Sequence, residues 1–318
     1  MLNPEPSAAI ELPTAVSVTG AAGRLAGRIH ETPVMTSRSL NDMAGCELFF
    51  KCENLQRGGS FKIRGAMNAA LLAAPDGPLV THSSGNHGAA LALAGRELDR
   101  EVIVVVPAVT PQFKQDNVRR YGAELRHCGP TLDEREAMVA DVLATGGTYV
   151  PPYDHANVIA GQGTMALELT RQVEGLDELW LPVGGGGMAS GCALGAPAGC
   201  RVMGAEPELA DDAYESLATH TRVPARPPVT VADGLRGALG ELTFAVLDRY
   251  GLAIERVSEA EIVAAQALLL GCLKQVVEPS GAVAFAALLR RQRREPRTAR
   301  VGVIVSGGNV DLLAADSG

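Results

Sequence analysis

Lys62 lies at a position that favours a reactive amine over a solvent-exposed, charged lysine. The stretch GSFKIRGAMNAAL places it between Phe61 and Ile63, and Ser60 with the apolar spacing that follows predicts a helix capped by Ser60. In the first turn of a helix the dipole disfavours a cation, and apolar neighbours and the nearby Arg64 also lower the pKa of a lysine. A neutral amine attacks carbonyl groups, which indicates a Schiff-base lysine. The alternative is a lysine whose stem covers an apolar face while its ammonium stays in water.

Three turns rich in glycine or serine follow predicted strands. In VGGGGMASG, glycines 184–187 open a helix and expose backbone N–H groups that can surround a phosphate. In THSSGNHG, Ser83, Ser84 and Asn86 lie at another helix N-terminus, where a carboxylate can bind. In VSGGN, Ser306 ends the last predicted strand. Together with a reactive lysine, these turns match pyridoxal phosphate, which needs a phosphate site, an amine and a partner for its ring nitrogen.

A different cofactor also fits part of this pattern. Gly184, Gly186 and Ala189 satisfy G-x-G-x-x-A, and Glu206 ends the next predicted strand, as in dinucleotide-binding sites. This alternative predicts a nicotinamide-dependent oxidoreductase, but the motif lies mid-chain and lacks the usual first-strand context. His87 has no acid beside it in the sequence, so we interpret it as a structural or capping histidine.

Composition limits the class of protein. With 47% hydrophobic and 20% charged residues, the 318-residue chain is globular, and its net charge of −8 argues against nucleic acid or an anionic membrane as partner. The six cysteines form no CxxC pair, which favours free thiols in a reducing compartment. The start of the chain lacks a signal-peptide pattern, and no apolar run approaches the ~20 residues of a membrane span. We therefore expect a soluble, cytoplasmic protein.

The succession of elements predicts the fold class. From about residue 78, β-branched runs alternate with helical patterns, which is typical of right-handed crossovers and a parallel sheet. The alternation pauses at TYVPPYDHANVIAGQG, which we interpret as a passage between two domains. The sequence thus predicts an α/β protein with two domains, each with a twisted, mostly parallel sheet flanked by helices. Ligand chemistry is expected at the carboxyl ends of the strands.

The motifs GSFKIRGA, SSGNHG, VIAGQGT, PVGGGGM, ADG and SGGN, in this order, resemble the serine/threonine dehydratase and serine racemase family of pyridoxal phosphate enzymes, of fold type II. The resemblance runs from about residue 20 to residue 312. It implies a tryptophan synthase β-like fold, with residues 1–72 and 152–318 as a large cofactor-binding domain and residues 73–151 as a small mobile domain. It also implies a homodimer.

The resemblance assigns roles to individual residues. Lys62 would hold the cofactor and move the Cα proton, Phe61 would pack near the pyridine ring, and Ser306 would face the ring nitrogen. Asn86 would donate to the phenolic oxygen of the ring, and the residue matching Ser84 is the second acid/base in racemases. The phosphate would be bound by the amides of Gly184, Gly185, Gly186, Gly187 and Met188. The substrate carboxylate would be bound by Ser83, Ser84, Gly85, Asn86 and His87.

The stretch GAEPELADDAYES resembles the divalent-cation site of the family. Glu206, the backbone carbonyl of Ala210 and Asp212 match its ligands, and such hard oxygen ligands suit Mg²⁺ or Ca²⁺. An acidic loop without an ion is the alternative.

The expected activity is dehydration of L-serine and L-threonine to a 2-oxo acid and ammonia. A hydroxyl such as that of Ser306 cannot keep the ring nitrogen protonated, which favours rapid loss of a β-leaving group over transamination. A serine racemase acting through Ser84 and a 3-hydroxyaspartate ammonia-lyase are alternatives. For the latter, Arg135 would have to reach a second substrate carboxylate, and we interpret it instead as a surface arginine.

Two departures from the family pattern concern regulation and substrate preference. Ala89 replaces a glutamine that helps racemases bind an activating nucleotide, although Tyr121 is kept. Tyr153 stands beside the cofactor site, where relatives carry asparagine or phenylalanine.

Overall fold

Two β-sheets organise the chain in the computed structural model, which describes residues 12–224, 227 and 229–310. The larger sheet has the order β1-β2-β10-β7-β8-β9, and all of its pairs except β1 with β2 are parallel. Its strands are β1 (Val34–Met35), β2 (Glu47–Cys52), β7 (Glu178–Pro182), β8 (Arg201–Pro207), β9 (Ala253–Val257) and β10 (Arg300–Val305). The last strand of the sequence therefore lies in the middle of this sheet, between β2 and β7.

The smaller sheet is parallel throughout, with the order β5-β4-β3-β6. Its strands are β3 (Leu79–Thr81), β4 (Val102–Pro107), β5 (Glu124–Cys128) and β6 (Thr148–Tyr149). All of them fall inside the segment 73–151, and every strand of the larger sheet falls outside it. The predicted fold class is confirmed, while the domain limits, whose outer ends lie beyond the described residues, and the mobility of the smaller unit stay predictions.

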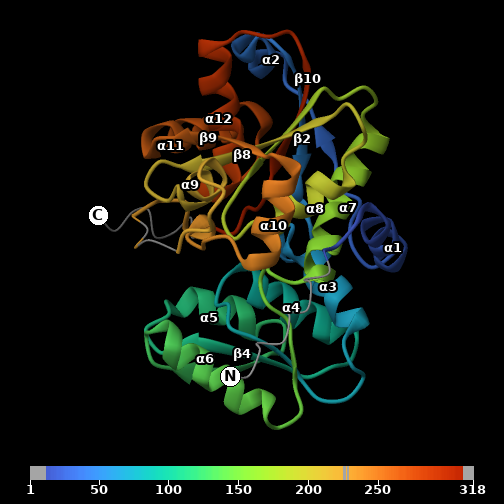
Figure 1. Ribbon diagram of the computed structural model, residues 1–318, viewed down its shortest axis with the longest axis vertical. Helices are drawn as coiled ribbons and strands as arrows, with labels where there is room; N and C mark the ends of the chain where they lie inside the picture. The colour runs from blue at the N-terminus through green and yellow to red at the C-terminus, as the bar shows by residue number, and fades with distance from the viewer. Residues whose placement is uncertain (1–11, 225–226, 228, 311–318) are drawn as a thin grey trace, which may run out of the picture.

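Helices flank both sheets. They are α1 (Ala15–Leu25), α2 (Arg38–Ala44), α3 (Lys62–Leu72), α4 (Asn86–Glu97), α5 (Gln112–Arg119), α6 (Leu132–Leu143), α7 (Ala156–Gln172), α8 (Gly187–Gly195), α9 (Asp212–Ala218), α10 (Glu241–Tyr250), α11 (Glu259–Leu268) and α12 (Pro279–Arg294). In Figure 1 the smaller sheet with α4, α5 and α6 forms the lower part of the molecule, and α7, α8, α11 and α12 belong to the upper part.

The core of the larger sheet follows from side-chain alternation along its strands. On β7, Trp180 belongs to the same buried cluster as Phe285 of α12, whereas Leu179 and Leu181 belong to a cluster with residues of α7 and α8. Successive side chains of a strand point to opposite faces, so helices must cover both sides of a sheet whose central strands carry buried apolar residues on both faces. This packing fixes the carboxyl ends of the central strands, where the sequence predicts the site.

The interpretation of residues 148–163 as a passage between domains is wrong for its second half. Helix α7 begins at Ala156, with the side chain of His155 accepting the N–H of Asn157. Its glycines serve packing: a Cβ on Gly161 would lie 2.5 Å from the carbonyl oxygen of Arg64, and one on Gly163 would lie 2.4 Å from that of Gly191. Only glycine allows helices α3 and α8 to approach α7 this closely.

The predicted N-cap at Ser60 is also wrong. Helix α3 begins at Lys62, and Ser60 has an extended backbone that forms a bridge with Gly307. The N–H of Phe61 donates to the carbonyl oxygen of Ser306 at 3.0 Å. The start of α3 is therefore attached to the end of β10, which brings Lys62 next to the loop that follows the central strand.

A buried ionic network stabilises the position of α3. The guanidinium of Arg64 donates to both carboxylate oxygens of Glu53 at 2.7 Å and to Glu168 of α7 at 3.0 Å, while Lys51 of β2 pairs with Glu168. Removing one member would leave a buried charge without a partner, at a cost of about 3–5 kcal/mol. The network ties the helix that carries Lys62 to β2 and α7.

Candidate active site

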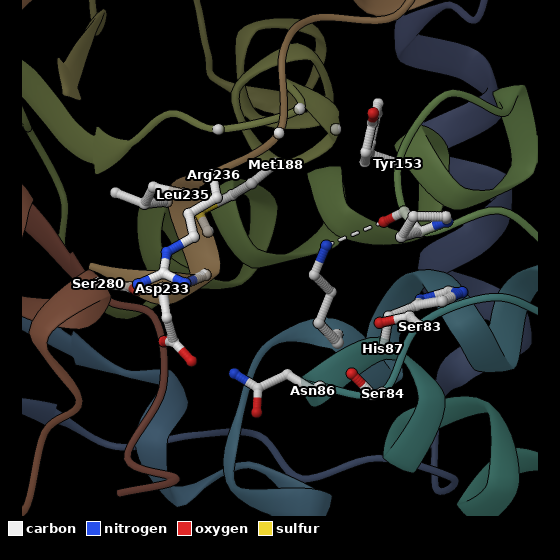
Figure 2. A pocket seen from close by; sticks show the side chains of 18 of the residues that line it. Ser83, Ser84, Asn86, His87, Tyr153, Met188, Asp233, Leu235, Arg236 and Ser280 are labelled. Atoms are coloured by element: carbon white, nitrogen blue, oxygen red, sulfur yellow. Dashed lines mark hydrogen bonds between the residues drawn. The ribbon is translucent and has the colours of Figure 1, made fainter. Parts of the chain in front are cut away.

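A cleft of about 1460 Å³ lies where the carboxyl ends of the two sheets meet. Strand β3 leads into Ser83, β7 into the loop at Gly184, and β10 into Ser306, and all three residues line the cleft. Figure 2 shows Ser84, Asn86 and His87 on one side and Tyr153 and Met188 on the other. The sequence-predicted residues therefore share one cavity, except for those of the cation site.

The amine of Lys62 is enclosed in this cleft. Its Nζ donates to the carbonyl oxygen of Pro152 at 2.9 Å and lies 5.0 Å from the centre of the Phe61 ring. Burial lowers the pKa of Lys62 to about 8, and the negative charge of Glu278 opposes that shift. Arg64, which the sequence suggested as a further cause, is instead engaged by buried carboxylates. An amine with this pKa is neutral far more often than a surface lysine.

The glycine loop, residues 184–187, precedes helix α8 and fits a phosphate. Within the described part of the chain, the N–H groups of Gly184, Gly185 and Gly186 donate to no protein acceptor. Gly186 has φ +82, and a Cβ on Gly185 would lie 2.4 Å from the Tyr153 ring. Free amides at a helix N-terminus, with no room for side chains, are the features of a phosphate site.

Residues 83–87 form the start of α4 and fit a carboxylate. Gly85 is the N-cap of the helix and offers no side-chain cap, so the first-turn amides remain available to a ligand. His87 is buried, with Nε2 at 3.0 Å from the carbonyl oxygen of Val150, and burial lowers its pKa to about 3. A histidine with this pKa stays neutral at physiological pH, in agreement with the structural role expected from the sequence.

Arg135 corrects one interpretation of the sequence. Arg135 is half-buried, extends from the first turn of α6 to line the cleft, and in the described structure its buried Nε meets no hydrogen-bond acceptor. Beside it, His82 lies 2.5 Å from the hydroxyl of Tyr149, and burial together with Arg135 lowers the pKa of His82 to about 4. Arg135 thus brings a positive charge to this side of the cleft, while the neighbouring His82 stays neutral.

Glu278 is a cleft residue that the sequence reasoning missed. It is the N-cap of α12 and only 6% exposed, and both of its carboxylate oxygens accept from Nδ2 of Asn86. An acid directly before Pro279, which starts a helix, was the available signal, because proline favours the first helical position and an acid suits the helix N-terminus.

The predicted cation ligands lie apart from the cleft lining. The carboxylate of Glu206 accepts the N–H groups of Ala213 and Tyr214 at the start of α9, and burial raises its pKa well above the ordinary value. Among the residues that the structure describes, no group of three or more His, Cys, Asp or Glu side chains could hold a metal. The set of two carboxylates and one backbone carbonyl therefore stays a prediction.

Fold and site together define a class of enzyme. A lysine of lowered pKa, a glycine loop with free amides at a helix N-terminus and a second helix N-terminus for a carboxylate meet between two parallel sheets. These are the parts needed to hold a phosphorylated aldehyde cofactor and an amino acid.

Comparison with known proteins gives the family. Residues 25–307 match the family model of pyridoxal-phosphate dependent enzymes, so the chain belongs to that family. It is 46% identical over 310 residues to a beta-hydroxyaspartate dehydratase of Paracoccus denitrificans, covering 95% of this chain and 98% of that protein. It is 43% identical over 308 residues to a serine racemase of Arabidopsis thaliana, covering 93% of each. The solved structure of maize serine racemase superposes with a TM-score of 0.92 at 39% identity, covering 95% of each chain.

The family match supports pyridoxal phosphate rather than a nicotinamide dinucleotide as cofactor. No helix in the described segments has the length and apolar character to cross a membrane.

Proposed function

We propose that this enzyme removes water from 3-hydroxy-L-amino acids and that its preferred substrate is 3-hydroxyaspartate, ahead of serine and threonine. The observation that carries the preference is the position of Arg135 in the cleft with its Nε buried and without an acceptor. The guanidinium of Arg135 is half-buried, and a carboxylate would give its enclosed Nε the acceptor that it lacks. Serine and threonine have only the α-carboxylate, whereas 3-hydroxyaspartate brings a second one.

In this proposal the residues of the cleft have separate roles in binding and proton transfer. The amides of residues 83–87 bind the α-carboxylate of the substrate, and Arg135 binds the distal one. Bound pyridoxal phosphate supplies the electron sink for the pair of electrons left at Cα. Nζ of Lys62, neutral in part at pH 7–8, accepts the Cα proton. Loss of the β-hydroxyl then gives an enamine that hydrolyses to oxaloacetate and ammonia.

Two relatives are named for activity on hydroxyaspartate, which supports this substrate, while others are named serine racemase. One of the proteins most similar to this chain is a beta-hydroxyaspartate dehydratase, with which it shares 46% of its residues. A serine/threonine dehydratase or a serine racemase would use the same lysine and the same glycine loop. The preference for 3-hydroxyaspartate over these alternatives therefore rests on Arg135.

Substrate kinetics test the proposal. The measurement is kcat/KM for 3-hydroxyaspartate, L-serine and L-threonine in the wild type, Arg135→Leu and Arg120→Leu, where Arg120 is an exposed arginine that also lines the cleft. For Arg135→Leu we expect a loss of roughly 10- to 100-fold for 3-hydroxyaspartate, equivalent to about 1.5–3 kcal/mol for a hydrogen bond to a charged group, and little change for serine. A wild type that prefers serine, or equal losses for all substrates, would refute the preference.

Racemisation of serine is a second candidate, because the hydroxyl of Ser84 lines the same cleft as Lys62. Chiral analysis of the serine left after partial turnover distinguishes it from elimination. Appearance of D-serine that Ser84→Ala abolishes, with keto-acid formation retained, would support a racemase activity, and no D-serine would exclude it.

We also propose a homodimer located in the cytoplasm, as the family resemblance and the composition suggest. Light scattering on the purified protein tests the first statement.

A further inference from the structure

Glu278 is the best-buried carboxylate of the cleft, and neither the family resemblance nor the proposed function uses it. Its Oε1 and Oε2 accept from Nδ2 of Asn86 at 2.9 and 3.2 Å, and its backbone N–H donates to the carbonyl oxygen of Gly307 at 3.0 Å. A Cβ on Gly307 would lie 2.4 Å from Oε1. The carboxylate is therefore held tightly between the loop after β10 and the start of α4.

The amide of Asn86 is fixed at both ends by this arrangement. Its Oδ1 accepts from Nδ2 of Asn309 at 2.9 Å, and Asn309 also donates to the carbonyl oxygen of Gly58 at 2.8 Å. Asn86 belongs to the segment that carries the smaller sheet, whereas Glu278 and Asn309 belong to the segment that carries the larger one. Partners on the other side of the cleft thus determine which way the Asn86 amide points.

In the part of the chain that the structure describes, the charges that act on Glu278 include those of Asp233, Lys114 and Lys62, and the first two form an ion pair with each other at 2.6 Å. The charge of Glu278 acts in turn on the amine of Lys62. Burial raises the pKa of Glu278 to about 7, with Asp233 adding to the rise and Asn86 opposing it.

We propose that Glu278 is a positioning residue with two effects on the site: its carboxylate holds the Asn86 amide in place across the cleft, and it supplies the negative charge that faces the amine of Lys62. The two effects are separable by substitution. Glutamine keeps an oxygen that can accept from Asn86 but removes the charge, whereas alanine removes both. The proposal holds for any of the candidate substrates, because it concerns the lysine and the asparagine alone.

The test uses the full chain freed of cofactor and measures where Lys62 reacts. Pyridoxal phosphate is added over a range of pH values, the adduct is trapped with borohydride, and the Lys62 peptide is quantified by mass spectrometry. Since a negative charge favours the ammonium form, removing it lowers the pH at which the neutral amine appears. For Glu278→Gln we expect the half-maximal pH of labelling to fall by about one unit, as for the loss of a neighbouring opposite charge.

Two further variants complete the design. Glu278→Ala should show the same fall in pH and, in addition, a faster dissociation of pyridoxal phosphate than Glu278→Gln, because Asn86 has lost its acceptor. Glu295→Gln makes the same chemical change just beyond the other end of the 16-residue helix α12 and should leave the profile unchanged.

The outcomes separate positioning from simple packing. If Glu278 only stabilises the start of α12, its variants will melt at lower temperature while the labelling profile overlays that of the wild type, and the charge effect is then refuted. If alanine and glutamine variants release the cofactor at the same rate, the effect on Asn86 is refuted. Neither result depends on substrate preference, so a failure here is distinct from a failure of the proposed function.

Discussion

Nζ of Lys62 donates a hydrogen bond to the carbonyl oxygen of Pro152, at 2.9 Å, and not to a carboxylate. A carbonyl oxygen accepts from a neutral amine as well as from an ammonium but brings no formal charge to stabilise the charged form. The contact therefore orients the amine without restoring the proton affinity that burial removes. Pro152 lies between β6 of the smaller sheet and α7, so the segment that joins these two elements orients the Nζ of Lys62.

Replacing Lys62 by arginine should abolish activity while keeping a positive charge. A guanidinium stays protonated and cannot form the bond to the cofactor aldehyde, so we expect keto-acid formation to fall by at least about 10³-fold, together with loss of the visible absorbance of the lysine-bound cofactor. Lys114→Arg, in the same cleft, is the matched control and should keep its colour. A coloured Lys62→Arg protein would show that another lysine holds the cofactor.

The glycine loop should tolerate no side chain. In Gly185→Ala the new Cβ would lie 2.4 Å from the ring of Tyr153, so we expect the dissociation constant for pyridoxal phosphate to rise by about tenfold or more. Tyr153→Ser in the same chain should recover part of the loss, since it removes the ring. Gly23→Ala in α1, where a Cβ meets nothing within 4 Å, should bind the cofactor normally. Equal affinities in all four proteins would contradict a close-fitting loop.

The predicted cation site can be checked by thermal unfolding. If Glu206, Ala210 and Asp212 bind Mg²⁺ or Ca²⁺, a concentration of 100 times Kd adds about 2.7 kcal/mol to the free energy of unfolding, and Tm rises by several degrees. Glu206→Gln keeps an acceptor for one of the two α9 amides but should lose this gain. Glu208→Gln, outside the predicted set, should keep it. A Tm insensitive to both cations and to a chelator would rule the site out.

The sequence predicted candidate site residues that lie within short motifs, but not contacts between residues far apart in the chain. The sequence predicted that Lys62, the glycine loop and Ser306 share one site, and all of them line the cleft, while their roles stay predictions. Each was found from residue types within one short segment. The pairing of Asn86 with Glu278 joins residues 192 positions apart, and no short window contains both. Arg135 posed a similar problem, because a helical pattern does not tell which face of α6 meets a cleft built by two sheets.

Glycine was the most misleading signal. The sequence analysis places the glycines of VIAGQG in a passage between two domains, but Gly161 and Gly163 lie within α7 and serve close contacts with α3 and α8. The same property, absence of a Cβ, gives the loop at residues 184–187 room for the phosphate that we predict there and allows close helix packing in α7. Only the tertiary contacts distinguish the two uses.

Acid should destabilise the fold through its buried neutral histidines. In the folded chain the pKa is about 3 for His87 and about 4 for His82, against an ordinary value of 6.5, so below pH 6.5 the unfolded chain binds protons that the folded chain excludes. Each histidine then lowers the free energy of unfolding by up to about 1.4 kcal/mol per pH unit. The raised pKa values of Glu278, about 7, and of Glu206 act in the opposite direction and offset part of this loss, so the contribution of one histidine is obtained from the difference between variants. Urea unfolding between pH 7.5 and roughly 4.5 measures the slope, which we expect to be shallower in His87→Gln than in the wild type or in His127→Gln, an exposed control. A His87→Gln slope equal to that of the wild type would mean that His87 is protonated in the folded chain.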